Sequence, residues 1–142
     1  MIQRDAMTVI GHEVRTSNEN PQEIGAAWQT FMGSGAGQDI PGRVDDKVVA
    51  VYCDYEGDHT KPYTYVLGCR VGEGTEAPEG MVRRELPAGS YAHYVSKGEQ
   101  PGALVQTWMS IWGAGLSRAF VCDYEIHDLS APERIEVFVG VQ

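Results

Sequence analysis

Two acidic motifs of identical sequence contain the residues with the clearest potential for chemistry. Cys-Asp-Tyr-Glu occupies residues 53–56 and again residues 122–125. In the strand expected over residues 120–129, Glu125 shares a face with Asp123 and His127, opposite a set of apolar residues. Alternation alone therefore favours a surface carboxylate in contact with water. Inside a cavity the same carboxylate could balance a bound cation, because Coulombic attraction is much stronger there than in water.

Aromatic residues form the second group that could bind a cation, through the negative faces of their rings. Trp28, Trp108 and Trp112 fall on expected helices, where a tryptophan more often belongs to the core. Phe138 falls on an otherwise polar strand face and needs a cover, which a pocket or a dimer contact would supply. Tyrosines in strands suit a wet pocket edge, because their rings are apolar and their hydroxyls polar. The tyrosines of this kind are Tyr52, Tyr65, Tyr91 and Tyr94.

The remaining reactive residue types show no spacing that predicts catalysis, a metal site or a cofactor. The glycine-rich run at 33–37 follows an expected helix, so it does not match a phosphate-binding loop. Cys53, Cys69 and Cys122 form no CxxC pair and lie in apolar runs, which predicts reduced, buried thiols. The four histidines lack metal-ligand spacing with each other or with cysteine: His12, His59, His93 and His127.

The composition predicts one globular domain with an acidic surface. The chain of 142 residues contains 20 Asp and Glu against 11 Lys and Arg, which gives a formal net charge of −9. Such a surface repels nucleic acid and anionic lipid and attracts cations, so direct DNA binding is not expected. No segment has the apolar length of a signal peptide or a membrane span. We therefore expect a cytoplasmic protein without membrane contact.

An internal repeat organises the elements that would position these residues. Residues 21–33 align with residues 101–113 at an offset of 80, which pairs Trp28 with Trp108. Each segment starts with Pro, carries apolar residues at i, i+4, i+7 and i+8, and ends with Gly. This pattern is typical of an amphipathic helix, so both segments are predicted to be helical.

Strand candidates complete a β-α-β-β unit around each helix. Residues 9–15 precede the first helix, and residues 81–95 precede the second. The run 81–95 bends at Pro87-Ala-Gly, so it is either two strands or one strand with a bulge. After each acidic motif, a polar turn leads into a further β-rich run, at 63–71 and at 134–141.

These units predict an α+β fold with pseudo-two-fold symmetry and an antiparallel, curved sheet. The repeat halves span about residues 1–72 and 80–142. Neither half would bury much alone, so residues 1–142 are expected to form a single domain with one continuous core. The irregular stretch at 34–46 is either a mobile lid or a plain connection.

Recognisable runs cover nearly the whole chain, at residues 9–18, 28, 54–56, 63–69, 86–94, 111–113 and 124–139. In this order they resemble the gyrase-inhibitor-like effector-binding superfamily, which also forms the ligand-sensing half of some multidrug-responsive transcription activators. The resemblance implies two main helices and a duplicated sheet around a central ligand pocket. Members of the superfamily often accept lipophilic cations there, with aromatic walls and a glutamate as counter-charge.

The resemblance also implies roles for individual residues. The superfamily's aromatic-Glu-x-Tyr pattern falls on Tyr124, Glu125 and His127, with His in place of the second Tyr. Glu125 is then the counter-charge, and Glu56, its counterpart in the repeated motif, is a second candidate. The candidate wall residues are Trp108, Trp112, Tyr65, Tyr91, Tyr94 and Phe138.

Three functions follow as alternatives. The first is a stand-alone, non-enzymatic protein that binds a lipophilic cationic small molecule without a cofactor, as a monomer or homodimer. It would be similar to the drug-binding proteins of integron cassettes. The second is a hydrolase of strained electrophilic natural products, with Glu125 and Glu56 as acid–base groups. The third is an acidic interaction module that inhibits a protein partner such as a topoisomerase.

Overall fold

The protein is an α+β fold with one eight-stranded antiparallel sheet and two helices. A computed structural model describes residues 1–35, 37–58, 60–100 and 102–142. None of the helices in these ranges is long and apolar enough to cross a membrane. In chain order the elements are β1 (Ile2–Arg4), β2 (Met7–Thr16), α1 (Pro21–Gly33), β3 (Val48–Cys53), β4 (Tyr63–Val71), β5 (Val82–Leu86), β6 (Gly89–Lys97), α2 (Gly102–Trp112), β7 (Arg118–His127) and β8 (Arg134–Val141).

The sequence patterns predicted most of these boundaries. Helix α1 starts at a proline, whose fixed φ and missing N–H suit the first helical turn, and it ends at the expected glycine. Strands β4 and β8 have the predicted limits. The run 81–95 forms two strands, β5 and β6, which are separated by Pro87 and Ala88. Pro101, the predicted start of the second helix, lies outside the described residues.

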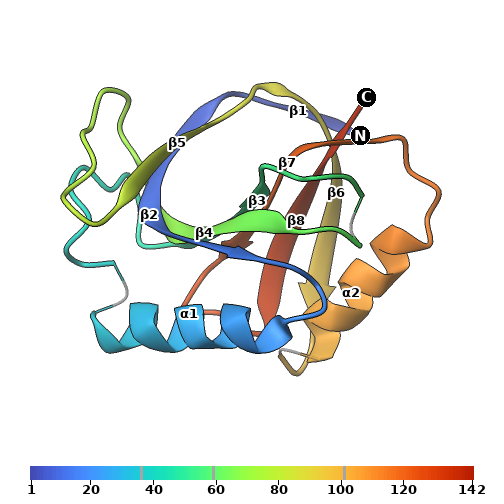
Figure 1. Cartoon of the computed structure of the whole chain (residues 1–142), viewed down its shortest axis with the longest axis horizontal. Helices are drawn as coiled ribbons and strands as arrows, with labels where there is room; N and C mark the ends of the chain where they lie inside the picture. The colour runs from blue at the N-terminus through green and yellow to red at the C-terminus, as the bar shows by residue number, and fades with distance from the viewer. Residues whose placement is uncertain (36, 59, 101) are drawn as a thin grey trace.

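The strand order is β1-β6-β8-β7-β3-β4-β2-β5, so the two halves of the repeat meet where β3 pairs with β7. The outermost strands are exchanged between the halves. Strand β1 begins the first half but pairs with β6 of the second, whereas β5 begins the second half but pairs with β2 of the first. In Figure 1 the sheet curls so that β1 and β5 lie on the same side, with α1 and α2 on the outside of the curl. The exchange confirms the predicted pseudo-two-fold arrangement.

The strand registers define which positions of the two halves correspond. Gly11 pairs with Gly68 in the first half, and Tyr91 pairs with Gly140 in the second. Gly11 and Tyr91 differ by 80 positions, the same offset that relates the two helices. Both Gly11 and Gly68 are required by close packing, because a Cβ at either position would lie within 2.2 Å of the other strand's backbone oxygen.

The same correspondence reassigns the counterpart of Glu125. Strand pair Val51–Val66 of the first half corresponds to Tyr124–Phe138 of the second. The next residue after Val51 is Tyr52, so Tyr52 occupies the position equivalent to Glu125. The prediction that Glu56 is the structural counterpart is therefore wrong, because the repeated acidic motif is four residues out of step with the fold.

Both faces of the central strands are buried, and this overturns the expectation from alternation. The inner face of the curl holds an apolar cluster that includes Val51, Cys122, Tyr124 and Phe138. The outer face is covered by the helices, with α1 against β2 and β4 and α2 against β6. Asp123 and Glu125 lie on this outer face and are fully buried rather than in water.

The irregular stretch 34–46 packs against the first half, in the part that the structure describes. Ile40 is buried in the cluster between α1 and the sheet. Arg43 forms a β-bridge with Val71, and the Val44 N–H donates to the Arg70 carbonyl. These contacts favour the plain connection over the lid. Ala36 lies outside the described residues.

Candidate functional site

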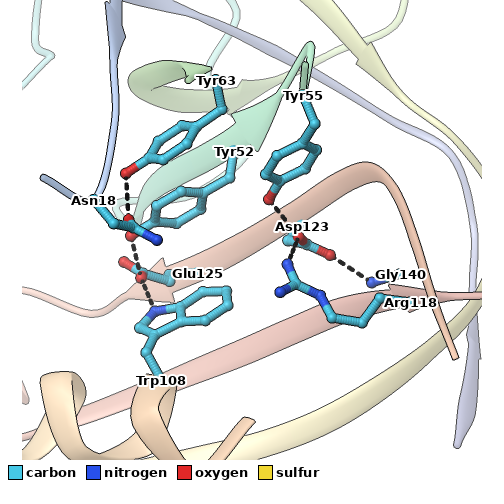
Figure 2. A network of polar contacts seen from close by, with 9 residues as sticks. All are labelled: Asn18, Tyr52, Tyr55, Tyr63, Trp108, Arg118, Asp123, Glu125 and Gly140. Carbon is cyan, nitrogen blue, oxygen red and sulfur yellow. Dashed lines mark hydrogen bonds and ion pairs between the residues drawn. The ribbon is translucent and has the colours of Figure 1, made fainter. Parts of the chain in front are cut away.

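The carboxylate of Glu125 lies under the helices and is only 1% exposed. Three side chains contact its oxygens, as Figure 2 shows in part. The Tyr52 hydroxyl donates to Oε2 over 2.6 Å, and the Trp108 indole N–H donates to the same oxygen over 2.7 Å. His127 Nε2 lies 2.7 Å from Oε1, so an N–H on this nitrogen would donate to the carboxylate. No Lys or Arg within the described ranges forms an ion pair with Glu125.

Aromatic rings from both halves surround this carboxylate. The Tyr52 ring lies 5.1 Å from the Trp108 ring, 5.1 Å from Tyr65 and 5.5 Å from Tyr63, measured between centroids. On the other side, the Trp28 ring lies 4.7 Å from the His127 imidazole. The carboxylate is therefore set among aromatic groups that come from α1, α2, β3, β4 and β7.

The tyrosine hydroxyls act as donors because they hold their protons firmly. Burial, followed by the charge of Glu125, raises the pKa of Tyr52 well above its ordinary value. The same two causes raise the pKa of Tyr65, whose hydroxyl accepts the Trp28 indole N–H over 2.9 Å. The Tyr63 hydroxyl donates to the Asn18 side chain over 2.9 Å. These bonds fix the ring positions around Glu125.

A second buried carboxylate lies two residues away on the same strand face. Asp123 is 0% exposed, and Arg118 Nη2 lies 2.6 Å from its Oδ2. The Tyr55 hydroxyl also donates to Oδ2, and the Gly140 N–H donates to Oδ1 over 2.8 Å. Burial raises the pKa of Asp123, while the Arg118 charge and these donors oppose the shift. Figure 2 shows this network beside the Glu125 cluster.

A bulge brings Arg118 onto the same face as Asp123. The register between β7 and β8 shifts between these two residues, and Phe120 has a left-handed φ of 52°. A regular strand would place residues five apart on opposite faces. As a result Phe120 does not follow the strand alternation expected from the sequence. The centroid of its ring lies 4.3 Å from the guanidinium carbon of Arg118.

Of the predicted site residues, the structure gathers Trp108 and Tyr65 near Glu125. Tyr94 is partly buried and packs against the cluster beneath α2. Trp112 stands at the last position of α2 and is 36% exposed. Both residues therefore lie at or beside α2.

Three predicted residues lie away from this cluster. Tyr91 and Phe138 are buried in the inner-face cluster on the opposite side of the sheet. The cover that Phe138 needs is supplied within the chain, by Tyr124 at 4.9 Å and by the Arg4 guanidinium at 4.4 Å, rather than by a pocket or a dimer contact. The Glu56 side chain is 59% exposed and forms a surface ion pair with Arg15.

Several residues around the buried carboxylates were absent from the predicted counter-charges and wall residues. One available signal was the spacing of Tyr63 and Tyr65, which places both on one strand face. A second was the pair Asp123 and Glu125, which also share a face. Nothing in the sequence reveals the bulge that adds Arg118. The absent residues that contact a carboxylate are Tyr52, Tyr55, Arg118 and His127, and those that pack beside them are Trp28 and Tyr63.

Glu125 is closed off from solvent in this structure, and two concavities lie away from it. One groove of about 600 Å³ runs between α2 and the sheet and is lined by Lys97, Gln106 and Arg134 among others. A cavity of about 200 Å³ opens on the inner face near Arg4 and Arg70. Among the described residues, no group of three or more His, Cys, Asp or Glu could hold a metal ion.

The chain belongs to the family of integron-associated effector binding proteins, whose family model matches residues 1–137. The transcriptional regulator BrlR of Pseudomonas aeruginosa is 30% identical over 133 residues, which cover 90% of this chain and 47% of the regulator. The putative transcriptional regulator YobU of Bacillus subtilis is 29% identical over 102 residues, 68% of this chain and 64% of that protein. The chain thus spans less than two thirds of these relatives.

Solved structures share the fold along the whole chain. An integron cassette protein from the mobile metagenome of Vibrio cholerae has a TM-score of 0.76 at 22% identity, covering 99% of this chain and 94% of its own. The structure of SAV2435 bound to tetraphenylphosphonium has a TM-score of 0.78 at 15% identity, covering 99% and 92%. A putative transcription regulation protein from Staphylococcus aureus MU50 has a TM-score of 0.77 at 15% identity, covering 99% and 95%.

Proposed function

We propose that this effector-binding protein binds lipophilic cationic small molecules at the outer-face site, with Glu125 as the counter-charge. One observation carries the proposal: a buried carboxylate has Tyr52, Trp108 and His127 as partners instead of a Lys or Arg. A buried carboxylate without a permanently charged partner is costly, and a bound cation would provide that partner.

The surroundings of Glu125 suit an apolar cation. Each aromatic face adds roughly 0.5–2 kcal/mol through cation–π attraction. Such contacts depend little on ligand shape, so one site can accept several compounds. SAV2435, whose structure contains bound tetraphenylphosphonium, has the same fold. This similarity supports a lipophilic cation as the ligand class here.

Ligand entry requires the closed cluster to open. A small-molecule site usually has a volume of roughly 300–1,000 Å³, whereas the rings of Trp108 and Tyr52 pack 5.1 Å apart beside the buried carboxylate. Trp108 is carried by α2, so displacement of its indole N–H from Glu125 moves a side chain of that helix. Cation binding is thereby coupled to the position of α2 against the sheet.

The test compares two ions of nearly the same shape and opposite charge, tetraphenylphosphonium and tetraphenylborate. We expect the cation to bind and to quench tryptophan fluorescence, and the anion to bind at least about tenfold more weakly. Glu125→Gln should weaken the binding of tetraphenylphosphonium by about 1.4–3 kcal/mol, because one buried charge interaction is lost. This loss corresponds to a dissociation constant about tenfold to a hundredfold higher.

Glu19→Gln is the matched control, because it removes one negative charge at an exposed residue of the loop before α1. Its affinity for tetraphenylphosphonium should stay within about twofold of the wild-type value. Equal affinity for the two ions, or an unchanged affinity in Glu125→Gln, would refute the proposal.

A further inference from the structure

The two buried carboxylates of β7 differ in how their charges are matched. Asp123 has an ionic partner, Arg118, at 2.6 Å. Glu125 has the Tyr52 hydroxyl, the Trp108 indole and the His127 imidazole. With a neutral imidazole, the three side chains Arg118, Asp123 and Glu125 together carry one uncompensated negative charge.

We propose that Arg118 makes the site selective for monocations and excludes dications. This inference rests on the proposed binding of cations at Glu125. A monocation matches the single uncompensated charge. A dication would bring a second positive charge into a buried site without a free counter-charge, which burial penalises strongly.

Arg118 lies close enough to the site to decide how much negative charge a ligand meets there. Its guanidinium carbon lies 6.0 Å from the centroid of the Trp108 ring, whose N–H contacts Glu125. Only Nη2 contacts Asp123, so the pair is end-on rather than bidentate. Its Nε and Nη1 are buried and have no hydrogen-bond partner among the described residues. Arg118 therefore neutralises Asp123 and leaves no counter-charge for a second positive charge near Trp108.

The backbone holds Arg118 in this place. Besides the bulge at Phe120, the C-terminal residue Gln142 ties down the start of β7. The Gln142 N–H donates to the Ser117 carbonyl over 2.8 Å, and its side-chain amide donates to the Arg118 carbonyl over 3.3 Å. The guanidinium is further sandwiched near the rings of Phe120 and Tyr55. Arg118 is thus a built part of the site, not a mobile surface cation.

Ethidium and propidium test the charge selectivity, because both contain the same phenanthridinium ring and propidium adds a second quaternary ammonium. At about pH 8, where imidazoles are generally neutral, wild-type protein should bind ethidium at least about tenfold more tightly than propidium. The readout is the ratio of the two dissociation constants from dye fluorescence. Equal affinities in the wild type would overturn the proposal.

Arg118→Gln isolates the role of the arginine. Asp123 then becomes a second counter-charge, which favours the dication. The dissociation constant of propidium divided by that of ethidium should therefore fall at least about fivefold. Because burial raises the pKa of Asp123, this gain should be larger at higher pH, where the carboxyl is ionised. An unchanged ratio in a folded Arg118→Gln variant would also overturn the proposal.

The double variant Arg118→Gln with Asp123→Asn removes both charges and leaves Glu125 as the counter-charge. This variant should return the ratio to near the wild-type value. Propidium is bulkier than ethidium in every variant, so a change in the ratio between variants reports charge and not size. Thermal melts identify variants that fold, and Arg118→Met, which also removes the charge, is measured if Arg118→Gln does not fold. Ethidium binding that is unaffected by Glu125→Gln would instead refute the proposed function itself.

Discussion

The two halves of the repeat build the same scaffold but contribute different chemistry to the site. The first half presents three tyrosines towards α1 and the central cluster: Tyr52, Tyr63 and Tyr65. Through the pairing of β4 with β2 and of β8 with β6, the equivalent positions in the second half are Glu125, Ile135 and Val137. At these equivalent positions the first half supplies phenol rings, and the second half supplies the carboxylate.

This asymmetry gives the site a single counter-charge. A symmetric pair of carboxylates near the axis would repel each other, and one of them would hold a proton. A symmetric pair of phenols would leave no charge for a cation. Duplication therefore provides two helices and a curled sheet, and divergence at Tyr52 and Glu125 provides the electrostatics.

The largest expected effect is at Asp123, whose equivalent in the first half is the uncharged residue Ala50. Asp123→Asn leaves Arg118 buried without an ionic partner. We expect the free energy of unfolding to fall by about 3–5 kcal/mol, as for other broken buried ion pairs. Urea denaturation monitored by tryptophan fluorescence measures the change.

Asp54→Asn is the control within the first half. Asp54 forms an ion pair with Arg84 at 2.8 Å, but its side chain is 48% exposed. Its loss should cost no more than about 1 kcal/mol. Similar losses in the two variants would contradict the view that the buried Arg118–Asp123 pair contributes more than the exposed Asp54–Arg84 pair.

The two equivalent tryptophans provide the next test. The Trp108 N–H donates to a carboxylate and the Trp28 N–H to a tyrosine hydroxyl. Phenylalanine removes the donor in each case and most of the ring remains. Hydrogen bonds to charged groups contribute about 1.5–3 kcal/mol and neutral ones about 0.5–1.5 kcal/mol. Trp108→Phe should therefore destabilise the protein more than Trp28→Phe, again by urea denaturation, and the reverse order would contradict the assignment.

The sequence predicted the framework well, because periodicity and punctuation are local signals. Proline and glycine mark the ends of α1, and β-branched and aromatic runs mark β4 and β8. The duplication also followed from an offset between the helices that the strand registers confirm. The exchange of β1 and β5 did not follow, since their short runs carry no pairing information.

The site was harder to predict, because alternation does not say which face is exposed. Strand β7 is buried on both faces, so the polar face of Asp123 and Glu125 read as a solvated one. The resemblance to a family pointed to Glu125, which the structure buries beneath the helices. Phe138 and Tyr91 lie on the other face of the sheet, which the curl encloses.

Unlike the outer face, the inner face is expected to be apolar in both halves. Cys53 of the first half pairs there with Cys122 of the second, and the Cys53 thiol can test this expectation. Burial raises the pKa of the Cys53 thiol to about 11. The unfolded thiol ionises at a lower pH, near the ordinary value of 9.0. The native state therefore holds the proton longer, and the stability from this group is full below about pH 9 and is lost as pH rises through about 11.

Urea denaturation at about pH 8 and pH 10.5 measures this loss. We expect about 1–2 kcal/mol less stability at the higher pH from this thiol, at about 1.4 kcal/mol per pKa unit. Cys53→Ala should lose correspondingly less between the two pH values. An identical pH dependence in the variant would show that the thiol is not in an apolar environment, and the inner face would then not be closed.

Glu56→Gln has the smallest expected effect and bears directly on the equivalence of the halves. Its side chain is exposed and pairs with Arg15 at the surface, so the loss of stability should be about 0–1 kcal/mol. If Tyr52 rather than Glu56 is the counterpart of Glu125, the dissociation constant of tetraphenylphosphonium should change by less than about twofold, as surface charges are screened by salt. A loss comparable to that in Glu125→Gln would place the two motifs in step after all. The strand registers could then not describe the ligand-bound form.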